Sequence, residues 1–341
     1  MSNDTRTIRP FLPLTRRGFM AGTAAAGLLA ATGVRAQGAT RSITHKFGAT
    51  EVPADPQRVV SVGWDEHDMM LTFGVVSVLQ RDAWGEQPYG TWPWAIPALG
   101  GAQPETFSDD MPFERILAME PDLIMGTWAG IDEDTWRRLS AIAPTVAGHP
   151  GYDDWATPWD ERVRFIGAVF GQEEKAEAEI AAIAQRIADI RDAHPEWQAL
   201  EAVSVTVDDT NFYVAAEGHS RGKLLLDLGF ILPDEIAAVA VDGNAAIARE
   251  NVAILDRDLV IWVNGQDDSS NIVNIPLRTR LAAHAEGREV YCDKVLTAAF
   301  SIQSPLSYNF LLDTLIPEIE RAVDGDPATP VEAAVAYGIA G

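Results

Sequence analysis

One long helical segment divides this 341-residue chain into two halves that share the same kind of pattern. From Gln172 to His194, apolar residues recur at alternating steps of four and three, as on one face of an amphipathic helix. Pro195 ends the segment. At 1.5 Å per residue the helix would be about 34 Å long, close to the diameter of a small domain. It is either a surface helix packed on one sheet or a rigid strut between two lobes.

Short strands that are apolar on both faces alternate with helices on each side of this segment. RVVSV (58–62) and DLIM (122–125) belong to the first half, and DLVIWV (258–263) belongs to the second. Such strands favour parallel sheets covered by helices. The sequence therefore predicts an α/β fold, with two α/β lobes of mainly parallel strands joined by a single long helix and a ligand cleft between them.

The predicted boundaries follow these patterns. They are an N-terminal extension at 37–57, a first lobe at 58–158, a connecting helical segment at 159–195, a second lobe at 196–323 and a disordered Pro/Ala/Gly-rich tail at 324–341. We expect the last long helix, Pro305 to Val323, to be interrupted at Pro317, since proline removes a hydrogen bond. We also expect a strand from Val75 to Leu79.

Residues 1–36 carry the pattern of an export signal. Arg16 and Arg17 precede an apolar run from Phe19 to Val34, and the small residues that follow predict cleavage after Ala36. The adjacent arginines resemble the twin-arginine type, whose machinery exports folded proteins. A short membrane anchor is the alternative, but the run is too short and too rich in Ala, Gly and Thr to span about 30 Å of hydrocarbon. We expect the mature protein in the periplasm.

Charge and cysteine content narrow the range of partners. Asp and Glu number 50 against 26 Lys and Arg, and removal of the arginine-rich signal makes the chain more acidic still. This disfavours nucleic acid and anionic membranes as partners and favours a neutral or cationic ligand. The single cysteine, Cys292, excludes an internal disulfide and is best read as a buried small residue. No cysteine follows the signal as a lipid-attachment site, so we expect a soluble protein.

Five stretches, in order along residues 58–323, resemble one family. They are FERILAMEPDLIMG (113–126), DERVRFIGAVFGQEEKAEAEI (160–180), GHSRGKLLLDLGF (218–230), ARENVAILDRDLVIWV (248–263) and SPLSYNFLLDTLIPEIERAV (304–323). The family comprises the substrate-binding proteins of bacterial ABC importers for ferric siderophores, haem and cobalamin. The resemblance implies a monomeric binding protein rather than an enzyme, without an intrinsic cofactor, in which ferric iron enters only as part of the siderophore.

The resemblance also implies a partner, an inner-membrane ABC permease with its ATPase. The family carries one glutamate per lobe that docks onto permease arginines, and the matching positions here are Glu114 and Glu250. Exposed charges of this kind steer encounter and set register. The alternative is that each glutamate only faces the positive end of a helix dipole.

In a two-lobed α/β protein the ligand lies outside the carboxyl ends of the strands. The loop RDAWGEQPYGTWPW (81–94) is rich in aromatic residues that follow neither helical nor strand periodicity. Some of them should line the cleft, unless they form a small core beneath a long loop. The ligand-binding candidates are Trp64, Arg81, Trp84, Tyr89, Trp92 and Trp128 in the first lobe, and Tyr213, Arg221, Phe300 and Gln303 in the second.

Arg81 and Arg221 are the main polar candidates, because a guanidinium contacts oxygen-rich ferric centres through paired donors. Arg221 could instead pair with a nearby acid. With few arginines in an acidic chain, a neutral or cationic hydroxamate complex is preferred to a catecholate.

Other ligands and an enzymatic role are the alternatives. Haem would need a Tyr or His axial ligand, and His67, His149 and His219 are possible ones. Cobalamin remains open, whereas the six scattered histidines do not have zinc-site spacing. The common hydrolase and phosphate-loop motifs are missing from the sequence. A glycosidase would require Glu114 and Glu250 to lie about 5–10 Å apart.

Overall fold

The structure, a computed structural model, describes residues 39–82, 87–108, 110–266 and 268–340. The predicted export signal and Trp84 lie outside these residues. Among the helices within the described ranges, none is both long and apolar enough to cross a membrane.

The first sheet has five parallel strands in the order β5-β4-β3-β6-β7. The strands are β3 (Val59–Ser61), β4 (Leu79–Arg81), β5 (Glu105–Phe107), β6 (Leu123–Met125) and β7 (Thr145–Val146). Its helices are α2 (Glu66–Thr72), α3 (Phe113–Ala118) and α4 (Glu133–Ser140), and η1 (Pro88–Gly90) and η2 (Ile96–Leu99) are 3₁₀ turns. Strands β3, β6 and β7 are buried on both faces, as the apolar runs of β3 and β6 predict.

Part of the predicted N-terminal extension is an antiparallel hairpin, β1 (Thr40–His45) and β2 (Gly48–Pro53). Ile43 and Val52 of this hairpin are buried in the first lobe's core. The hairpin is also tied to the loop after β7, because the Lys46 backbone N–H donates to the Gly148 carbonyl at 2.8 Å.

The second sheet has the order β10-β9-β8-β11-β12. Strands β8 (Ala202–Val207), β11 (Leu259–Val263) and β12 (Glu289–Cys292) are parallel, whereas β9 (Asn211–Ala215) and β10 (Asn244–Ala248) run antiparallel to their neighbours. The smaller helices are α7 (Ser220–Asp227), α8 (Asp234–Ala237), α9 (Ser270–Val273) and α10 (Ala282–Ala285), with 3₁₀ turns η3 (Pro195–Ala199), η4 (Arg249–Leu255) and η5 (Arg278–Arg280). The predicted α/β class with mainly parallel sheets is confirmed.

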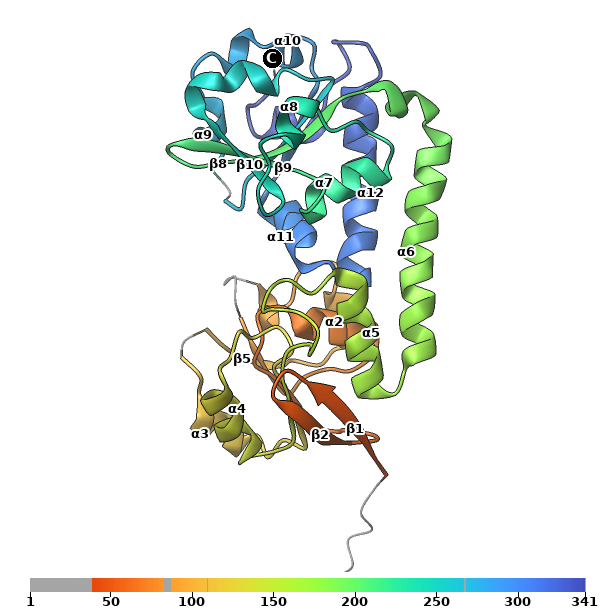
Figure 1. The fold of residues 1–341 in the computed structure, drawn as a ribbon, viewed down its shortest axis with the longest axis vertical. Helices are drawn as coiled ribbons and strands as arrows, with labels where there is room; N and C mark the ends of the chain where they lie inside the picture. Colours follow the sequence, from red (N-terminus) through yellow and green to blue (C-terminus); the bar gives the residue numbers. More distant parts are fainter. Residues whose placement is uncertain (1–38, 83–86, 109, 267, 341) are drawn as a thin grey trace, which may run out of the picture. The chain divides into compact units, whose positions relative to one another are not determined.

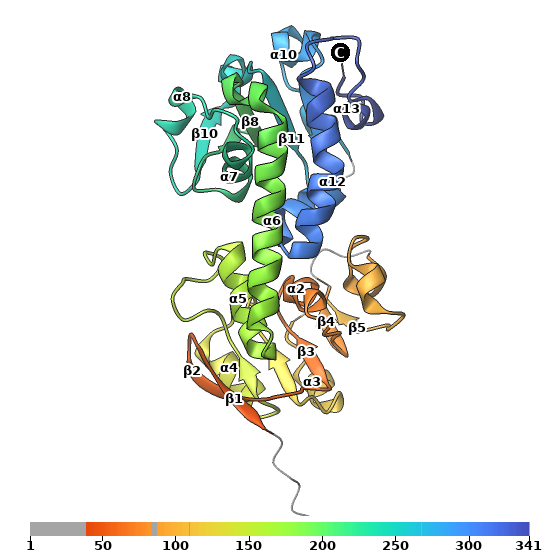
Figure 2. The ribbon, with the colours of Figure 1, turned by 90° about the vertical axis from the view of Figure 1, so that its right-hand side faces the viewer.

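Helix α5 (Trp159–Phe170) leads into α6 (Glu173–Ala193), which runs alongside both lobes (Figures 1 and 2). The apolar stripe of α6 is divided between two cores. Ala176 and Ile180 pack into the first lobe's core, whereas Ile183, Ile187 and Ile190 pack into that of the second. The segment is therefore a strut that belongs to both lobes.

Helices α11 (Lys294–Ile302) and α12 (Pro305–Ala322) follow β12. The expected interruption at Pro317 is wrong, because α12 continues through this proline. The carbonyl that loses its helical donor belongs to Asp313, which is exposed, so water can satisfy it.

The expectation of a disordered tail is also wrong. Residues 332–336 form helix α13 (Glu332–Ala336), and Val331, Ala334 and Ile339 are buried in the second lobe's core. Burial of these three side chains offsets the entropy cost of ordering the segment.

Candidate functional site

Three tryptophans meet at the carboxyl ends of the first lobe's parallel strands. Trp64 follows β3, Trp128 follows β6, and Trp155 lies in the loop after β7. The Trp155 ring centroid is 5.3 Å from that of Trp128 and 6.5 Å from that of Trp64, both in edge-to-face geometry. Trp64 and Trp155 are 43% and 51% exposed. They offer apolar ring surface at the edge of the sheet where ligands of α/β proteins bind.

Two arginines accompany these rings. The Arg81 guanidinium lies 5.4 Å from the Trp64 ring centroid and donates through Nε to the Val62 carbonyl at 3.0 Å. Partial burial lowers the pKa of Arg81, although Glu66 opposes this change. The Arg162 guanidinium lies 3.9 Å from the Trp128 ring centroid. Cation–π contacts of this kind hold rings and guanidinium groups in fixed positions.

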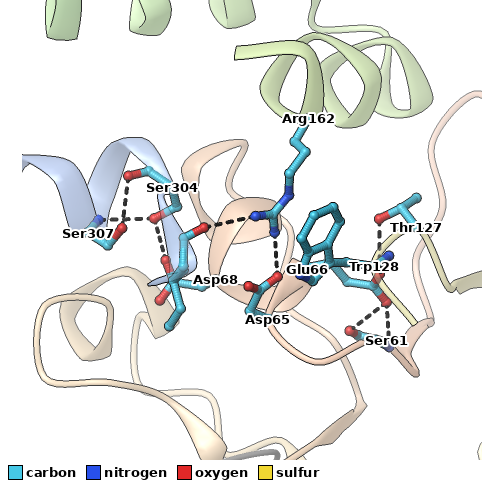
Figure 3. Close-up of polar contacts among 11 residues, drawn as sticks. Ser61, Asp65, Glu66, Asp68, Thr127, Trp128, Arg162, Ser304 and Ser307 are labelled. Atoms are coloured by element: carbon cyan, nitrogen blue, oxygen red, sulfur yellow. Dashed lines mark hydrogen bonds and ion pairs between the residues drawn. The ribbon is translucent and has the colours of Figure 1, made fainter. Parts of the chain in front are cut away.

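Three carboxylates are buried at the start of α2, which are those of Asp65, its N-cap residue, and of Glu66 and Asp68 in its first turn (Figure 3). Glu66 accepts hydrogen bonds from two loops. Its Oε1 accepts from Ser61 Oγ and the Gly63 N–H at 3.1 and 2.8 Å, and its Oε2 accepts from Thr127 Oγ1 and the Trp128 N–H at 2.9 and 2.8 Å.

Asp65 forms a buried ion pair with Arg162 of α5. Burial raises the pKa of Asp65 to about 7, and the Arg162 charge opposes this rise. Arg162 also donates to the Ile302 carbonyl at 3.1 Å, at the end of α11. One guanidinium therefore links α2, the Trp128 ring and the second lobe.

Asp68 makes the second link between lobes. Its carboxylate accepts from Trp94 Nε1 at 2.8 Å and from Ser304 Oγ. The same Ser304 hydroxyl caps α12 by accepting from the Ser307 N–H at 3.0 Å. Burial raises the pKa of Asp68 to about 6.

His67, between these acids, does not supply a compensating charge. Its Nε2 lies 3.0 Å from the Gly90 carbonyl, and its Nδ1 is buried without a hydrogen-bond partner. Burial lowers the pKa of His67 to about 4, so the ring is neutral at physiological pH. Being buried, it is also poorly placed to bind a haem iron.

In the second lobe, Arg221 stands at the start of α7 with a largely buried guanidinium. Its Nε has no hydrogen-bond partner, and within the described part of the chain it forms no ion pair. Burial lowers the pKa of Arg221 to about 10. The neighbouring His219 has its pKa lowered to about 4, first by burial and then by Arg221, and its Nδ1 accepts from the Arg221 N–H at 3.2 Å. A desolvated cation without a carboxylate partner suits an oxygen-rich ligand.

The remaining ligand candidates differ in what they offer. Tyr89 is 38% exposed, and the Tyr213 hydroxyl donates to Asp208 at 2.9 Å. Gln303 ends α11 with its Nε2 3.5 Å from the Tyr308 hydroxyl.

Trp92 and Phe300 are buried, at 2% and 5% exposure. Trp92 stacks on Trp94 at 5.4 Å, and Trp94 packs on Phe310 at 5.2 Å. This part of the aromatic loop forms the small core that was the alternative to lining the cleft. The ring surfaces of Trp92 and Phe300 are already occupied by core contacts, so this arrangement does not support them as ligand contacts.

Glu114 and Glu250 occupy corresponding places in the two lobes. Each is the second residue of a helical segment, α3 or η4, that leads into the fourth strand of its sheet, β6 or β11. Both side chains are exposed.

The strand-end rule pointed to Asp65 together with Trp64, but sequence reasoning missed Glu66, Asp68, Arg162 and Trp155. The run DEHD (65–68) within an apolar stretch was the available signal for the acids, because buried charges in such a stretch need partners. Trp155 could have been found by applying the strand-end rule to the loop after β7 as well. Apart from Ser61 and Gly63, the partners of the acids lie 26 or more positions away along the chain and could not have been found.

Comparison with known proteins shows which family the chain belongs to. A periplasmic binding protein family model matches residues 59–296. The chain belongs to the periplasmic binding protein family.

Three similar proteins illustrate the range of this family. A periplasmic solute binding protein from Mycobacterium smegmatis is 33% identical, with a TM-score of 0.74 over 83% of this chain and 99% of that one. A probable siderophore-binding lipoprotein of Bacillus subtilis is 24% identical over 68% of this chain and 71% of its own length. The Streptococcus pneumoniae protein PiaA, solved with ferrichrome, is 23% identical, with a TM-score of 0.65 over 84% of this chain and 99% of that one.

The buried acids of this periplasmic binding protein predict a specific pH dependence. Because the pKa of Asp68 is raised in the folded state, the folded protein binds more protons than the unfolded chain between pH 4 and about 6, and Asp68 destabilises the fold as pH rises through this window. Asp68→Asn removes this contribution. The free energy of unfolding of Asp68→Asn minus that of wild type should therefore increase by about 1 kcal/mol as the pH rises from 5 to 7.5. Urea denaturation at each pH measures this difference.

Asp192→Asn, at an exposed position near the end of α6, serves as the control. It should leave the pH profile of wild type unchanged. A constant difference between Asp68→Asn and wild type across this range would show that Asp68 does not titrate between pH 5 and 7.5, and would contradict this prediction.

Proposed function

We propose that this protein binds a ferric siderophore, preferably a neutral or cationic hydroxamate complex, and delivers it to an inner-membrane ABC permease with its ATPase. The observation that carries the proposal is the grouping of Trp64, Trp128 and Trp155 with Arg81 at the strand ends. Ring faces can cover the apolar backbone of a siderophore while guanidinium groups contact the oxygens around the iron.

The charges of the site favour a hydroxamate complex over a catecholate. Arg162 is already paired with Asp65, and Arg81 lies in the field of Glu66. Of the three arginines Arg81, Arg162 and Arg221, Arg221 is then the one that has no carboxylate partner within the described residues. A catecholate complex, which carries several negative charges, would need more free cations than this acidic chain offers.

Two similar proteins support testing siderophores as ligands. The Bacillus relative is described as a probable siderophore-binding lipoprotein, and the Streptococcus protein was solved with ferrichrome, a hydroxamate siderophore. These descriptions concern those proteins, and they support testing the same class of ligand here.

A ligand panel tests the proposal. Intrinsic tryptophan fluorescence should be quenched saturably by ferrichrome and ferrioxamine B, and less or not at all by a ferric catecholate, ferric citrate, haem or cobalamin. Quenching is expected because Trp64 and Trp155 are exposed beside the proposed ligand. Tight binding of haem or cobalamin alone would assign a different ligand, and a panel without any saturable response would exclude siderophore capture.

The panel is repeated with Arg221→Gln. Loss of a desolvated guanidinium from the ligand oxygens should weaken hydroxamate binding at least about tenfold. Arg191→Gln, on the exposed surface of α6, is the matched control and should bind like wild type. Equal affinities for all three proteins would remove Arg221 from the site.

We further propose that Glu114 and Glu250 dock onto the permease, since they are exposed at corresponding positions of the two lobes. Glu114→Arg combined with Glu250→Arg should abolish siderophore uptake by cells and leave the affinity of the purified protein intact, because like charges would then face the permease arginines. Glu174→Arg, an exposed glutamate in the first turn of α6, is the control. Normal uptake by the double variant would show that these residues only face helix dipoles.

We also propose export by the twin-arginine route, on the pattern of residues 15–36. Replacement of both Arg16 and Arg17 by lysine should leave the full-length precursor in the cytoplasm, as judged by cell fractionation. A processed protein in the periplasm of that variant would point to a different route.

A further inference from the structure

We propose that Glu66 is a positioning residue that holds Trp64 and Trp128 in place for the ligand. This inference rests on the proposed function, because it assigns Glu66 a role behind the ligand surface rather than in contact with the ligand. Glu66 is fully buried, at 0% exposure, whereas Trp64 is 43% exposed.

Each oxygen of Glu66 serves a different loop. Oε1 accepts from Ser61 Oγ and the Gly63 N–H, on the chain that leaves β3 toward Trp64. Oε2 accepts from Thr127 Oγ1 and the Trp128 N–H, on the chain that leaves β6. The two loops are also joined directly, because the Trp64 N–H donates to the Trp128 carbonyl at 2.9 Å. The carboxylate thus fixes both tryptophan backbones to one point, and Figure 3 shows its contacts with Ser61, Thr127 and Trp128.

Gly63 shows how closely the first loop wraps this carboxylate. A Cβ atom at position 63 would lie 2.3 Å from Glu66 Oε2 and 2.5 Å from its carboxyl carbon. Only glycine lets the backbone pass at this distance. Trp64 is the next residue after Gly63, so a movement of the Glu66 carboxylate against Gly63 would be transmitted to Trp64.

The donor set uses both oxygens of the Glu66 side chain as acceptors. A hydroxyl can rotate and become an acceptor, but the backbone N–H groups of Gly63 and Trp128 cannot, and they bind opposite oxygens. In Glu66→Gln one of the two oxygens is replaced by an NH₂ group, which is a donor. In either orientation of the side chain, this NH₂ group faces one of the two backbone N–H groups. One loop must lose its anchor although the shape of the residue is unchanged.

A purely structural role for Glu66 is the competing explanation, since an unsatisfied buried donor also destabilises a fold. The two roles differ in how Glu66 couples to the tryptophans. If Glu66 acts through Trp64 and Trp128, its substitution weakens ligand binding only while those rings are present.

The test is a double-mutant cycle with ferrioxamine B as the probe and titration calorimetry as the measurement. Glu66→Gln alone should weaken binding at least about tenfold, whereas in a Trp64→Ala/Trp128→Ala background it should weaken binding less than about twofold. The same loss in both backgrounds would overturn the proposal.

Glu289→Gln is the matched control. Glu289 is also a buried carboxylate, in the second lobe, whose Oε1 and Oε2 accept from Trp262 Nε1 and Arg278 at 2.7 Å each. It should lower thermal stability without changing affinity for ferrioxamine B. An equal loss of affinity in Glu289→Gln would attribute the Glu66 effect to general destabilisation and overturn the proposal.

Two further measurements cover failure at earlier steps. If Glu66→Gln does not fold, Thr127→Val removes one donor to Oε2 with little change in shape and should weaken binding by a smaller factor; unchanged binding would overturn the proposal.

If wild type binds neither ferrioxamine B nor ferrichrome, the proposed function fails. Acrylamide quenching of ligand-free Glu66→Gln then decides the positioning role, because displaced Trp64 and Trp128 must change in accessibility, and unaltered quenching would refute it.

Discussion

Burial of three carboxylates within one turn of α2 is the constraint on which the arrangement of both lobes depends. Each acid is satisfied by a different part of the chain: Asp65 by Arg162 of α5, Glu66 by the loops after β3 and β6, and Asp68 by Trp94 and Ser304. Only one of these contacts is an ion pair, so most of the charge is held by N–H and O–H dipoles. Such networks are stable only when every member is satisfied, which fixes the relative positions of the segments that supply the donors.

The sequence predicted the fold well where apolar periodicity was long or strand-like, and less well where tertiary contacts decide. The apolar runs at 58–62, 122–125 and 258–263 contain strands β3, β6 and β11, as predicted. The expected strand from Val75 to Leu79 begins only at Leu79, because Val76 packs on Leu71 and Leu99 instead of joining the sheet. A short apolar run does not by itself distinguish these two environments.

The candidate site was only partly predictable for the same reason. The strand-end rule brought Trp64, Arg81 and Trp128 into one region, and the structure places them around the same loops. It could not distinguish exposed Trp64 from buried Trp92, because that difference depends on Trp94 and on residues of α11 more than two hundred positions away. The acids of α2 could be recognised in the sequence as charges, but most of their partners are brought to them by long-range contacts.

The divided stripe of α6 has a mechanical consequence. Ala176 and Ile180 pack into one core and Ile183 into the other, so less than one turn of helix separates the two anchorages. A helix clamped at both ends can bend only slightly over so short a span, since any larger movement would pull an apolar side chain out of its core. The two lobes of this protein should therefore move relative to each other by slight elastic bending of α6 rather than by rotation about a hinge. The residues that face each other across the site would then keep nearly the same positions relative to one another.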